Sequence, residues 1–289
     1  MYEFLPPPPL DLAALHAGRL SRLRATMADH GLDLCVLTNP VNLRYAANYR
    51  SFPLFQSHIP STYLMVPVEG PLVLYGGYCG PLDTVDENRP AHSVTSFDAG
   101  LGLSAVAAGF ADDVAGFLGE VGLPADAVVG LERTTPSGHA ALSNADLHIV
   151  DSDPVLELAR SRKSSLEIEA LRYSIDVAEL GLAEMEAALV PGVSENRLWS
   201  ILHQVNIAHD GDWIDGRMLC SGPRSNPWYQ EATGRAIQVG DLVPFDTDMI
   251  GPFGYCADIS RTFLCGGVPP SAEQGYLYER ARDEIEHNT

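Results

Sequence analysis

The sequence predicts an α/β domain followed by a second domain in which two long helices precede strands and turns. Strand-like and helix-like segments alternate in the first half of the chain, as they do in α/β folds. The pattern changes after Pro154, and a long amphipathic segment begins at about Ser165. A chain of 289 residues also has room for two domains with buried cores. We place the boundary near residues 153–160, which gives domains at 1–155 and 156–289.

The first domain is expected to follow a short polyproline II arm at Pro6–Pro9. Asn39-Pro40 predicts a turn, and Glu69-Gly70 predicts the turn of a hairpin between two apolar runs. Apolar runs and apolar periodicity predict helices at 11–30, 105–121 and 137–144, and strands at 34–37, 63–68, 72–75, 128–131 and 147–150.

The second domain is expected to begin with two helices, at 165–189 and 194–209. Pro191-Gly192 predicts the end of the first helix, and Ser194 is a suitable N-cap for the second. From Gly216 onward the pattern favours strands and turns. Apolar residues at helical spacing form the expected inward stripe of the first helix: Ile168, Leu171, Ile175, Ala178, Leu182 and Met185.

The chain is acidic, with 18 basic and 38 acidic residues and a net charge of -20. Such a surface repels nucleic acid and anionic lipid, so we expect neither nucleic acid nor a membrane as a partner. Five scattered cysteines without a CxxC motif argue against a disulfide framework and a structural zinc site. The N-terminus lacks the features of a secretory signal, and no segment has the uninterrupted apolar length that spans a bilayer. We therefore expect a cytoplasmic protein.

Three carboxylates are expected to meet on a β-hairpin at residues 240–263. Two apolar runs flank Gly251-Pro252-Phe253-Gly254, which suits a three-residue loop with a type I turn and a left-handed Gly254. That register places Asp258 directly across from Asp248. Asp246 joins them, because residues two apart on a strand share a face.

Like charges at this spacing must bind cations or take up protons. Oxygen ligands on a rigid hairpin suit Fe, Mn, Co or Zn ions when imidazole joins them, and a carboxylate between two ions is typical of two-metal sites. A solvated acidic turn is the simpler explanation of a lone Asp-x-Asp. The apolar runs on both sides of these acids favour the metal site.

The hairpin resembles the metal-binding hairpin of the creatinase/Xaa-Pro peptidase superfamily, in Gly240-Asp241-x-Val243-x-x-Asp246 and in 254–263. Further resemblances lie at 31–45, 160–168 and 191–195. The resemblance implies an α/β creatinase-like N-terminal domain followed by an α+β pita-bread catalytic domain, in a protein that is usually a homodimer. It also implies two divalent metal ions, held by two hairpin aspartates and by a later histidine and two glutamates. Asp258 takes one aspartate position, and Asp246 or Asp248 takes the other.

No histidine and glutamate set of this kind follows Asp258, so we expect the catalytic domain to be incomplete and the sequence to be C-terminally truncated at Thr289. Peptide-cleaving members also place a histidine upstream of the hairpin, where this chain has Trp228 and Tyr229. Aromatic residues there, together with the additional Asp248, resemble the dimethylsulfoniopropionate lyases of the superfamily.

The lyase resemblance implies cleavage of a small sulfonium carboxylate to dimethyl sulfide and acrylate. Metal ions can hold the carboxylate and acidify the adjacent C–H bond, and the rings of Trp228 and Tyr229 can attract the sulfonium cation. Ordinary packing is an equally good explanation of the two rings. An Xaa-Pro dipeptidase or aminopeptidase is the second interpretation, and a non-catalytic binding module with the pita-bread fold is the third.

Overall fold

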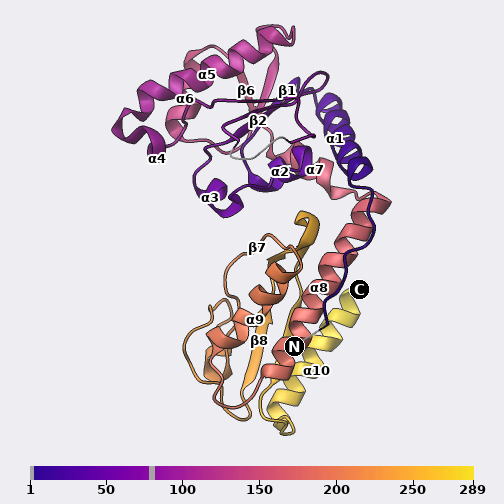
Figure 1. Cartoon of the computed structure of the whole chain (residues 1–289). Helices are drawn as coiled ribbons and strands as arrows, with labels where there is room; N and C mark the ends of the chain where they lie inside the picture. Colours follow the sequence, from indigo (N-terminus) through magenta and orange to yellow (C-terminus); the bar gives the residue numbers. More distant parts are fainter. Residues whose placement is uncertain (1–2, 78–81) are drawn as a thin grey trace. The chain divides into compact units, whose positions relative to one another are not determined.

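The structure is a computed structural model that describes residues 3–77 and 82–289. It contains two compact units (Figure 1). One unit comprises Pro9–Ile168, and the other comprises Glu169–Thr289 together with the N-terminal arm up to Pro8. The division lies later than the expected boundary at 155/156, because helix α7 (Asp153–Ser161) contributes apolar side chains to the core of the first unit.

The first unit is built on a six-stranded sheet with the order β4-β3-β2-β1-β5-β6. Strands β1, β5 and β6 are parallel to one another, whereas β2 is antiparallel to both of its neighbours. The strand bounds are β1 Leu34–Leu37, β2 Tyr63–Pro67, β3 Val73–Tyr75, β4 Glu87–Arg89, β5 Val128–Leu131 and β6 His148–Asp151. The predicted strands are thus confirmed, and β4 is an addition at the edge.

Helices cover both faces of this sheet. Cys35 and Leu37 of β1 pack in one apolar cluster, and Leu34 and Val36 pack in the other. Both faces of β1 are therefore buried, which is why it reads as a continuous apolar run. The first cluster holds residues of α1 (Leu12–Asp29), α2 (Pro40–Ala47) and α7, and the second holds residues of α5 (Leu103–Glu120) and α6 (Pro136–Asn144).

The predicted turn at Asn39-Pro40 is wrong, because these two residues begin helix α2. The Asn39 side chain accepts a hydrogen bond from the Val41 N–H, and Pro40 occupies the first helical position. Asparagine is a good N-cap, and proline is pre-organised for a first helical turn, so a turn signal and a helix start look alike here. Short helices α3 (Pro53–His58), α4 (Ser96–Ala99) and η1 (Gly100–Gly102) complete the unit.

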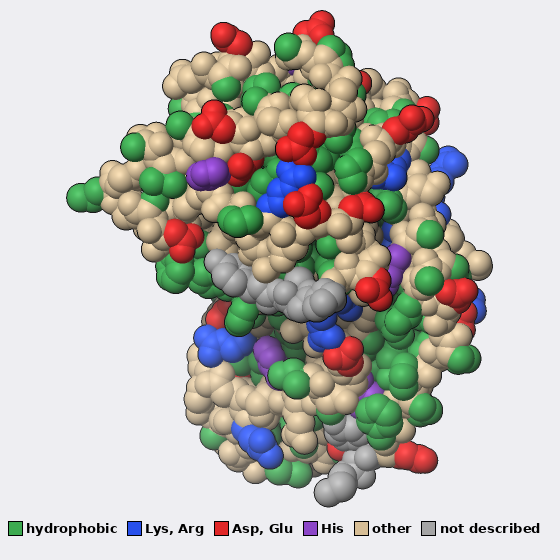
Figure 2. All heavy atoms as spheres, turned by 45° about the horizontal axis from the view of Figure 1, so that its top comes forward, with side chains coloured by type: hydrophobic (Ala, Val, Ile, Leu, Met, Phe, Trp, Pro, Cys, Tyr) green, Lys and Arg blue, Asp and Glu red, His purple; other side chains and the backbone are tan. Residues whose placement is uncertain are grey.

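One stretch of the described residues, Ser96–Glu120, is long and apolar enough by composition to cross a membrane. Its α5 portion buries Phe110, Val114 and Phe117 in the second cluster of the six-stranded sheet. The apolar character of α5 is therefore explained by its place in the core of the first unit. Acidic side chains are spread over the surface that Figure 2 shows, in keeping with the net charge of -20.

The second unit packs two helices against strands. Helices α8 (Ser165–Ala188) and α9 (Glu195–Ala208) share one apolar cluster with the inward residues of the hairpin strands. The strands are β7 Trp213–Ile214, β8 Leu242–Asp246, β9 Met249–Ile250, β10 Cys256–Ala257 and β11 Ser260–Leu264, followed by helix α10 Ala272–Asn288. A short helix, η2 (Gly222–Ser225), lies before β8.

The inward stripe of α8 differs in part from the expected one. Ala178, Leu182 and Met185 are buried as predicted, but Ile168 is 41% exposed. Ile168 lies in the first turn of α8, where the helix belongs to the first unit. The apolar stripe therefore begins only at Ala170.

A buried carboxylate fastens the start of α9 to the segments that precede the hairpin. Glu195 is fully buried and accepts hydrogen bonds from the hydroxyls of Ser221 and Thr233, from the Thr233 N–H and from the guanidinium of Arg224. Burial pushes the pKa of Glu195 upward, but these hydrogen bonds outweigh it and hold the pKa below its ordinary value.

We predict that this network makes stability depend on pH with a defined sign. Because the folded-state pKa of Glu195 is depressed, its contribution is present above the ordinary carboxyl pKa and is lost as pH falls through the folded value. Glu195→Gln should lower the free energy of unfolding by about 3 kcal/mol at pH 7, since it leaves Arg224 without its anion. Denaturant unfolding should show this difference shrinking toward pH 3. The exposed Glu186→Gln on α8 is the control, and a pH-independent gap would contradict the charge argument.

Candidate metal centre

A single register runs along the whole hairpin. Ser260 pairs with Asp246 in the outer ladder, and Ala257 pairs with Met249 in the inner one. Both pairs imply the same alignment, which places Asp258 across from Asp248 as the sequence predicted. The ladder is interrupted only at the residues around these two aspartates.

The loop of the hairpin has the predicted length but a different turn. Gly251 and Tyr255 close it through a hydrogen bond from the Gly251 N–H to the Tyr255 carbonyl, and the Gly254 N–H donates to the Gly251 carbonyl. Gly254 has the expected positive φ, but Phe253 also has a positive φ of 60°. A type I turn requires a negative φ at that position, so the prediction of a type I turn is wrong.

Strand alternation separates the acids from the core. Val243, Phe245, Thr247 and Met249 point inward and are buried. Asp246 and Asp248 therefore lie on the opposite, outer face, as the period of two requires. Their partners Asp258 and Ser260 share that face, and the Ser260 hydroxyl donates to a carboxylate oxygen of Asp246 at 2.9 Å.

Thr247 bridges the interruption in the ladder. Its side chain is fully buried, and its hydroxyl donates to the Ala257 carbonyl at 2.6 Å and accepts from the Ile259 N–H at 2.8 Å. Those two backbone groups flank Asp258. A single hydroxyl thus replaces backbone pairing and holds the chain on both sides of a proposed ligand while Asp248 adopts a positive φ of 39°.

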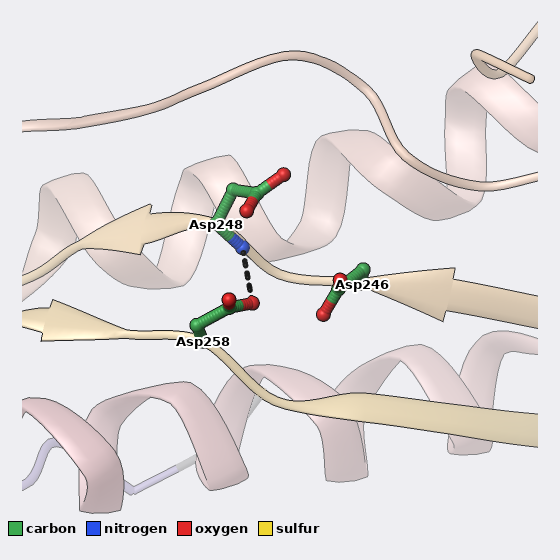
Figure 3. Close-up of side chains that lie close together, drawn as sticks. All are labelled: Asp246, Asp248 and Asp258. Atoms are coloured by element: carbon green, nitrogen blue, oxygen red, sulfur yellow. Dashed lines mark hydrogen bonds between the residues drawn. The ribbon is translucent and has the colours of Figure 1, made fainter. Parts of the chain in front are cut away.

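The three aspartates converge in space, as Figure 3 shows. One carboxylate oxygen from each lies within 4.8 Å of the others. The Asp248 N–H also points at an Asp258 oxygen, 3.4 Å away. Asp246 and Asp248 are half-buried, whereas Asp258 is exposed. Among the described residues this is the group of acidic, histidine or cysteine side chains that could hold a metal ion.

Crowding and partial burial disfavour full ionisation of this cluster. Burial, followed by the negative charges of Asp246 and Asp215, raises the pKa of Asp248. The pKa of Asp258 is also raised, first by partial desolvation and then by a hydrogen bond with Asp246 and by the charge of Asp246. The hydrogen bond from the Asp248 N–H acts in the opposite direction and lowers this pKa. A divalent cation would relieve this repulsion, and hard or borderline metals accept such oxygen ligands. The residues present therefore fit part of a metal site.

The aromatic pair predicted for substrate binding is placed differently. Tyr229 is 82% exposed, and Trp228 is half-buried. Their ring centroids are 6.3 Å apart and the rings are tilted by 46°. No contact described for residues 3–77 and 82–289 joins either ring to the three aspartates. A role for Trp228 and Tyr229 in substrate binding stays a prediction.

Comparison with known proteins agrees with this geometry. Residues 19–162 match the creatinase/prolidase N-terminal domain, and residues 169–287 match metallopeptidase family M24. Together the two matches account for nearly the whole chain. The chain belongs to the M24 metallopeptidase superfamily. The fold is accordingly a creatinase N-terminal domain followed by an M24 pita-bread domain, as the sequence predicted.

Two curated relatives are similar along almost the whole chain. It is 32% identical over 288 residues to the dimethylsulfoniopropionate lyase DddP of Roseovarius nubinhibens and, equally, to that of Roseobacter denitrificans. Each alignment covers 96% of this chain and 64% of the relative, so the chain spans less than two thirds of their length. Among solved structures, an Xaa-Pro dipeptidase from Bacillus anthracis matches with a TM-score of 0.68 at 23% identity, over 91% of this chain and 68% of that one. A prolidase from Thermococcus sibiricus matches with a TM-score of 0.69 at 20% identity, over 94% and 71%.

Two residues of the centre were missed from the sequence. Thr247 escaped notice because a threonine in a strand is ordinary, although its inward position in an apolar row was a usable signal. Asp215 escaped notice because no local sequence pattern predicts that its strand, β7, pairs with β9 beside Asp248. The Asp215 N–H donates to the Asp248 carbonyl at 3.1 Å, which adds a fourth acid beside the cluster.

We predict opposite effects of Asp258→Asn on the metal-free and metal-loaded protein. Without metal, removal of one repelling charge should raise the melting temperature. With metal, the loss of a ligand should reduce bound metal to about half or less and should lower the gain in melting temperature on loading. Elemental analysis and calorimetry measure both quantities, with the exposed Asp176→Asn as the control. Unchanged metal content in Asp258→Asn would exclude it as a ligand.

We also predict that the Thr247 hydroxyl is needed for metal affinity. Thr247→Val keeps the volume but leaves the Ala257 carbonyl and Ile259 N–H without a partner, at a cost of about 2 kcal/mol in stability. It should also weaken metal binding at least tenfold in titration calorimetry, whereas Thr247→Ser should retain most of it. Thr62→Val removes another buried hydroxyl, in the first unit, and should lower stability without changing metal affinity. Equal metal affinity in Thr247→Val and wild type would contradict the positioning role.

Proposed function

We propose that the protein is a metal-dependent lyase that cleaves dimethylsulfoniopropionate to dimethyl sulfide and acrylate. The observation that carries the proposal is the 32% identity over 96% of the chain to two lyases of this activity. The Asp-Thr-Asp arrangement at 246–248 and the aromatic pair at 228–229 support it, because the resemblance associates both with lyases rather than peptidases.

The reaction is a β-elimination. A base removes the proton on the carbon next to the carboxylate, the C–H electron pair forms the C=C bond of acrylate, and the C–S pair leaves with dimethyl sulfide. No attacking water is required. Two divalent ions, Fe, Mn, Co or Zn, would supply a site for the substrate carboxylate and would acidify that C–H bond.

The chain's own residues would prepare this step. Asp246, Asp248 and Asp258 would hold the ions on the outer face of the hairpin. Thr247 fixes the spacing of these three ligands from the core side. Because the hairpin is anchored to α8 and α9 through one apolar cluster, the carboxylates change position little when charge develops on the substrate.

An Xaa-Pro dipeptidase or aminopeptidase is the second candidate. The M24 match and the fold shared with Xaa-Pro dipeptidase and prolidase structures favour it. Against it stands the absence of histidine at 228 and 229, where the resemblance places the residue that assists peptide cleavage.

One experiment separates the two candidates. We expect the metal-loaded full-length protein to release dimethyl sulfide, measured by headspace gas chromatography, and to leave Gly-Pro and Ala-Pro intact. Loss of the signal in Asp246→Asn, together with reduced metal content, would tie turnover to the centre. Hydrolysis of either dipeptide without dimethyl sulfide would overturn the lyase proposal in favour of the peptidase, and neither activity would favour a binding module.

A further inference from the structure

The small sheet β10-β9-β7 has two unlike faces. Its inner face carries Ile214, Met249 and Ala257, which are all buried. Its outer face is therefore made by the alternate strand residues Trp213, Ile250 and Cys256, and it continues in the aspartates that directly adjoin the three strands, Asp215, Asp248 and Asp258. All six residues are half-buried or exposed.

Asp215 and the metal centre form one row across this outer face. Trp213 pairs with Ile250 and Ile214 pairs with Met249, so the next pair in register is Asp215 with Asp248. The hydrogen bond from the Asp215 N–H to the Asp248 carbonyl extends the ladder to this pair. Asp248 in turn lies across from Asp258. Asp215 is thus one strand, about 5 Å, away from a proposed metal ligand.

Trp213 belongs to the same outer face, two residues before Asp215. Its indole N–H donates to an Asp215 carboxylate oxygen at 2.7 Å. The hydrogen bond links an aromatic ring to a carboxylate. Trp213 is half-buried and Asp215 is exposed, so a ligand can reach the pair without displacing the core.

We propose that Trp213 and Asp215 bind the cationic end of a zwitterionic substrate whose carboxylate lies at the metal centre. This inference rests on the proposed function, because a lyase for dimethylsulfoniopropionate must recognise a sulfonium. A sulfonium donates no classical hydrogen bond, so it is held by the π face of an aromatic ring and by a nearby negative charge. One strand spacing between Asp215 and Asp248 is comparable with the reach of the two methylene groups that join the two ends of the substrate.

The placement favours this pair over Trp228 and Tyr229 as the cation site. Tyr229 is 82% exposed, and neither of the two rings has a described contact with the row of acids. Trp213, by contrast, is linked to that row by strand pairing and by its hydrogen bond.

Two unreactive ligands test the proposal by titration calorimetry on the metal-loaded full-length protein. One is 3-(trimethylammonio)propanoate, a zwitterion with a cationic end, and the other is 4-methylpentanoate, in which an uncharged carbon replaces the sulfur. Wild type should bind the zwitterion about tenfold more tightly than 4-methylpentanoate, whose end opposite the carboxylate is uncharged. Asp215→Asn and Trp213→Leu should each abolish most of this preference with metal content unchanged, whereas Trp213→Phe should retain part of it.

One control variant and several contrary outcomes make the proposal falsifiable. Asp176→Asn, which removes an exposed acid on α8, should keep the full preference. The proposal is overturned if wild type shows no preference, if both Asp215→Asn and Trp213→Leu keep it, or if Trp228→Leu or Tyr229→Leu removes it instead. A fall in kcat with unchanged KM in Asp215→Asn would also overturn it, because that result marks a base rather than a binding group. Because both ligands are unreactive, a charge preference that depends on Trp213 and Asp215 would stand even if no dimethyl sulfide were released.

Discussion

The register of one β-hairpin is the constraint on which the candidate site depends. Because strand side chains alternate, a shift of one residue would turn Asp246 and Asp248 into the core and would expose Phe245 and Met249. Burial of that apolar row against α8 and α9 fixes the register, and the fixed register forces like charges together on the other face. Hydrophobic packing therefore supplies the free energy that holds carboxylates at a spacing which their mutual repulsion opposes.

The backbone around Asp248 departs from regular strand geometry as a result of this register. Asp248 has a positive φ, and the ladder stops around it, so backbone groups beside Asp258 lose their usual partners. The Thr247 hydroxyl forms hydrogen bonds with both of these backbone groups from the buried side. A strained residue beside a compensating hydrogen bond is common where function sets the geometry. The first unit has no comparable conflict in its central strand, since β1 is apolar on both faces and covered on both.

Much of this architecture could be predicted from the sequence because it follows from periodicity. The β1 and β5 runs, the α9 N-cap and the Asp248–Asp258 alignment all rest on local patterns. What escaped prediction depends on long-range pairing or on ambiguous signals. Asn39-Pro40 is equally good as a turn or as a helix start. The position of Asp215 beside Asp248 depends on β7 pairing with β9, a contact between segments 35 residues apart that no local pattern encodes.

The outer face of this sheet suits an elimination better than the hydrolysis of a peptide bond. A peptidase must place a water molecule and stabilise the tetrahedral oxyanion that its attack creates, for which a nearby histidine is suited. This chain has Trp228 and Tyr229 at the positions where the resemblance puts that histidine. An elimination instead needs both ends of a short zwitterion fixed, so that the C–H and C–S bonds adopt the geometry for departure. The candidate metal centre, one strand away from the proposed aromatic–carboxylate pair, would meet that requirement. The Trp213–Asp215 pair itself adds no donor for an oxyanion, because Asp215 can only accept hydrogen bonds when ionised and the Trp213 N–H is already committed to it.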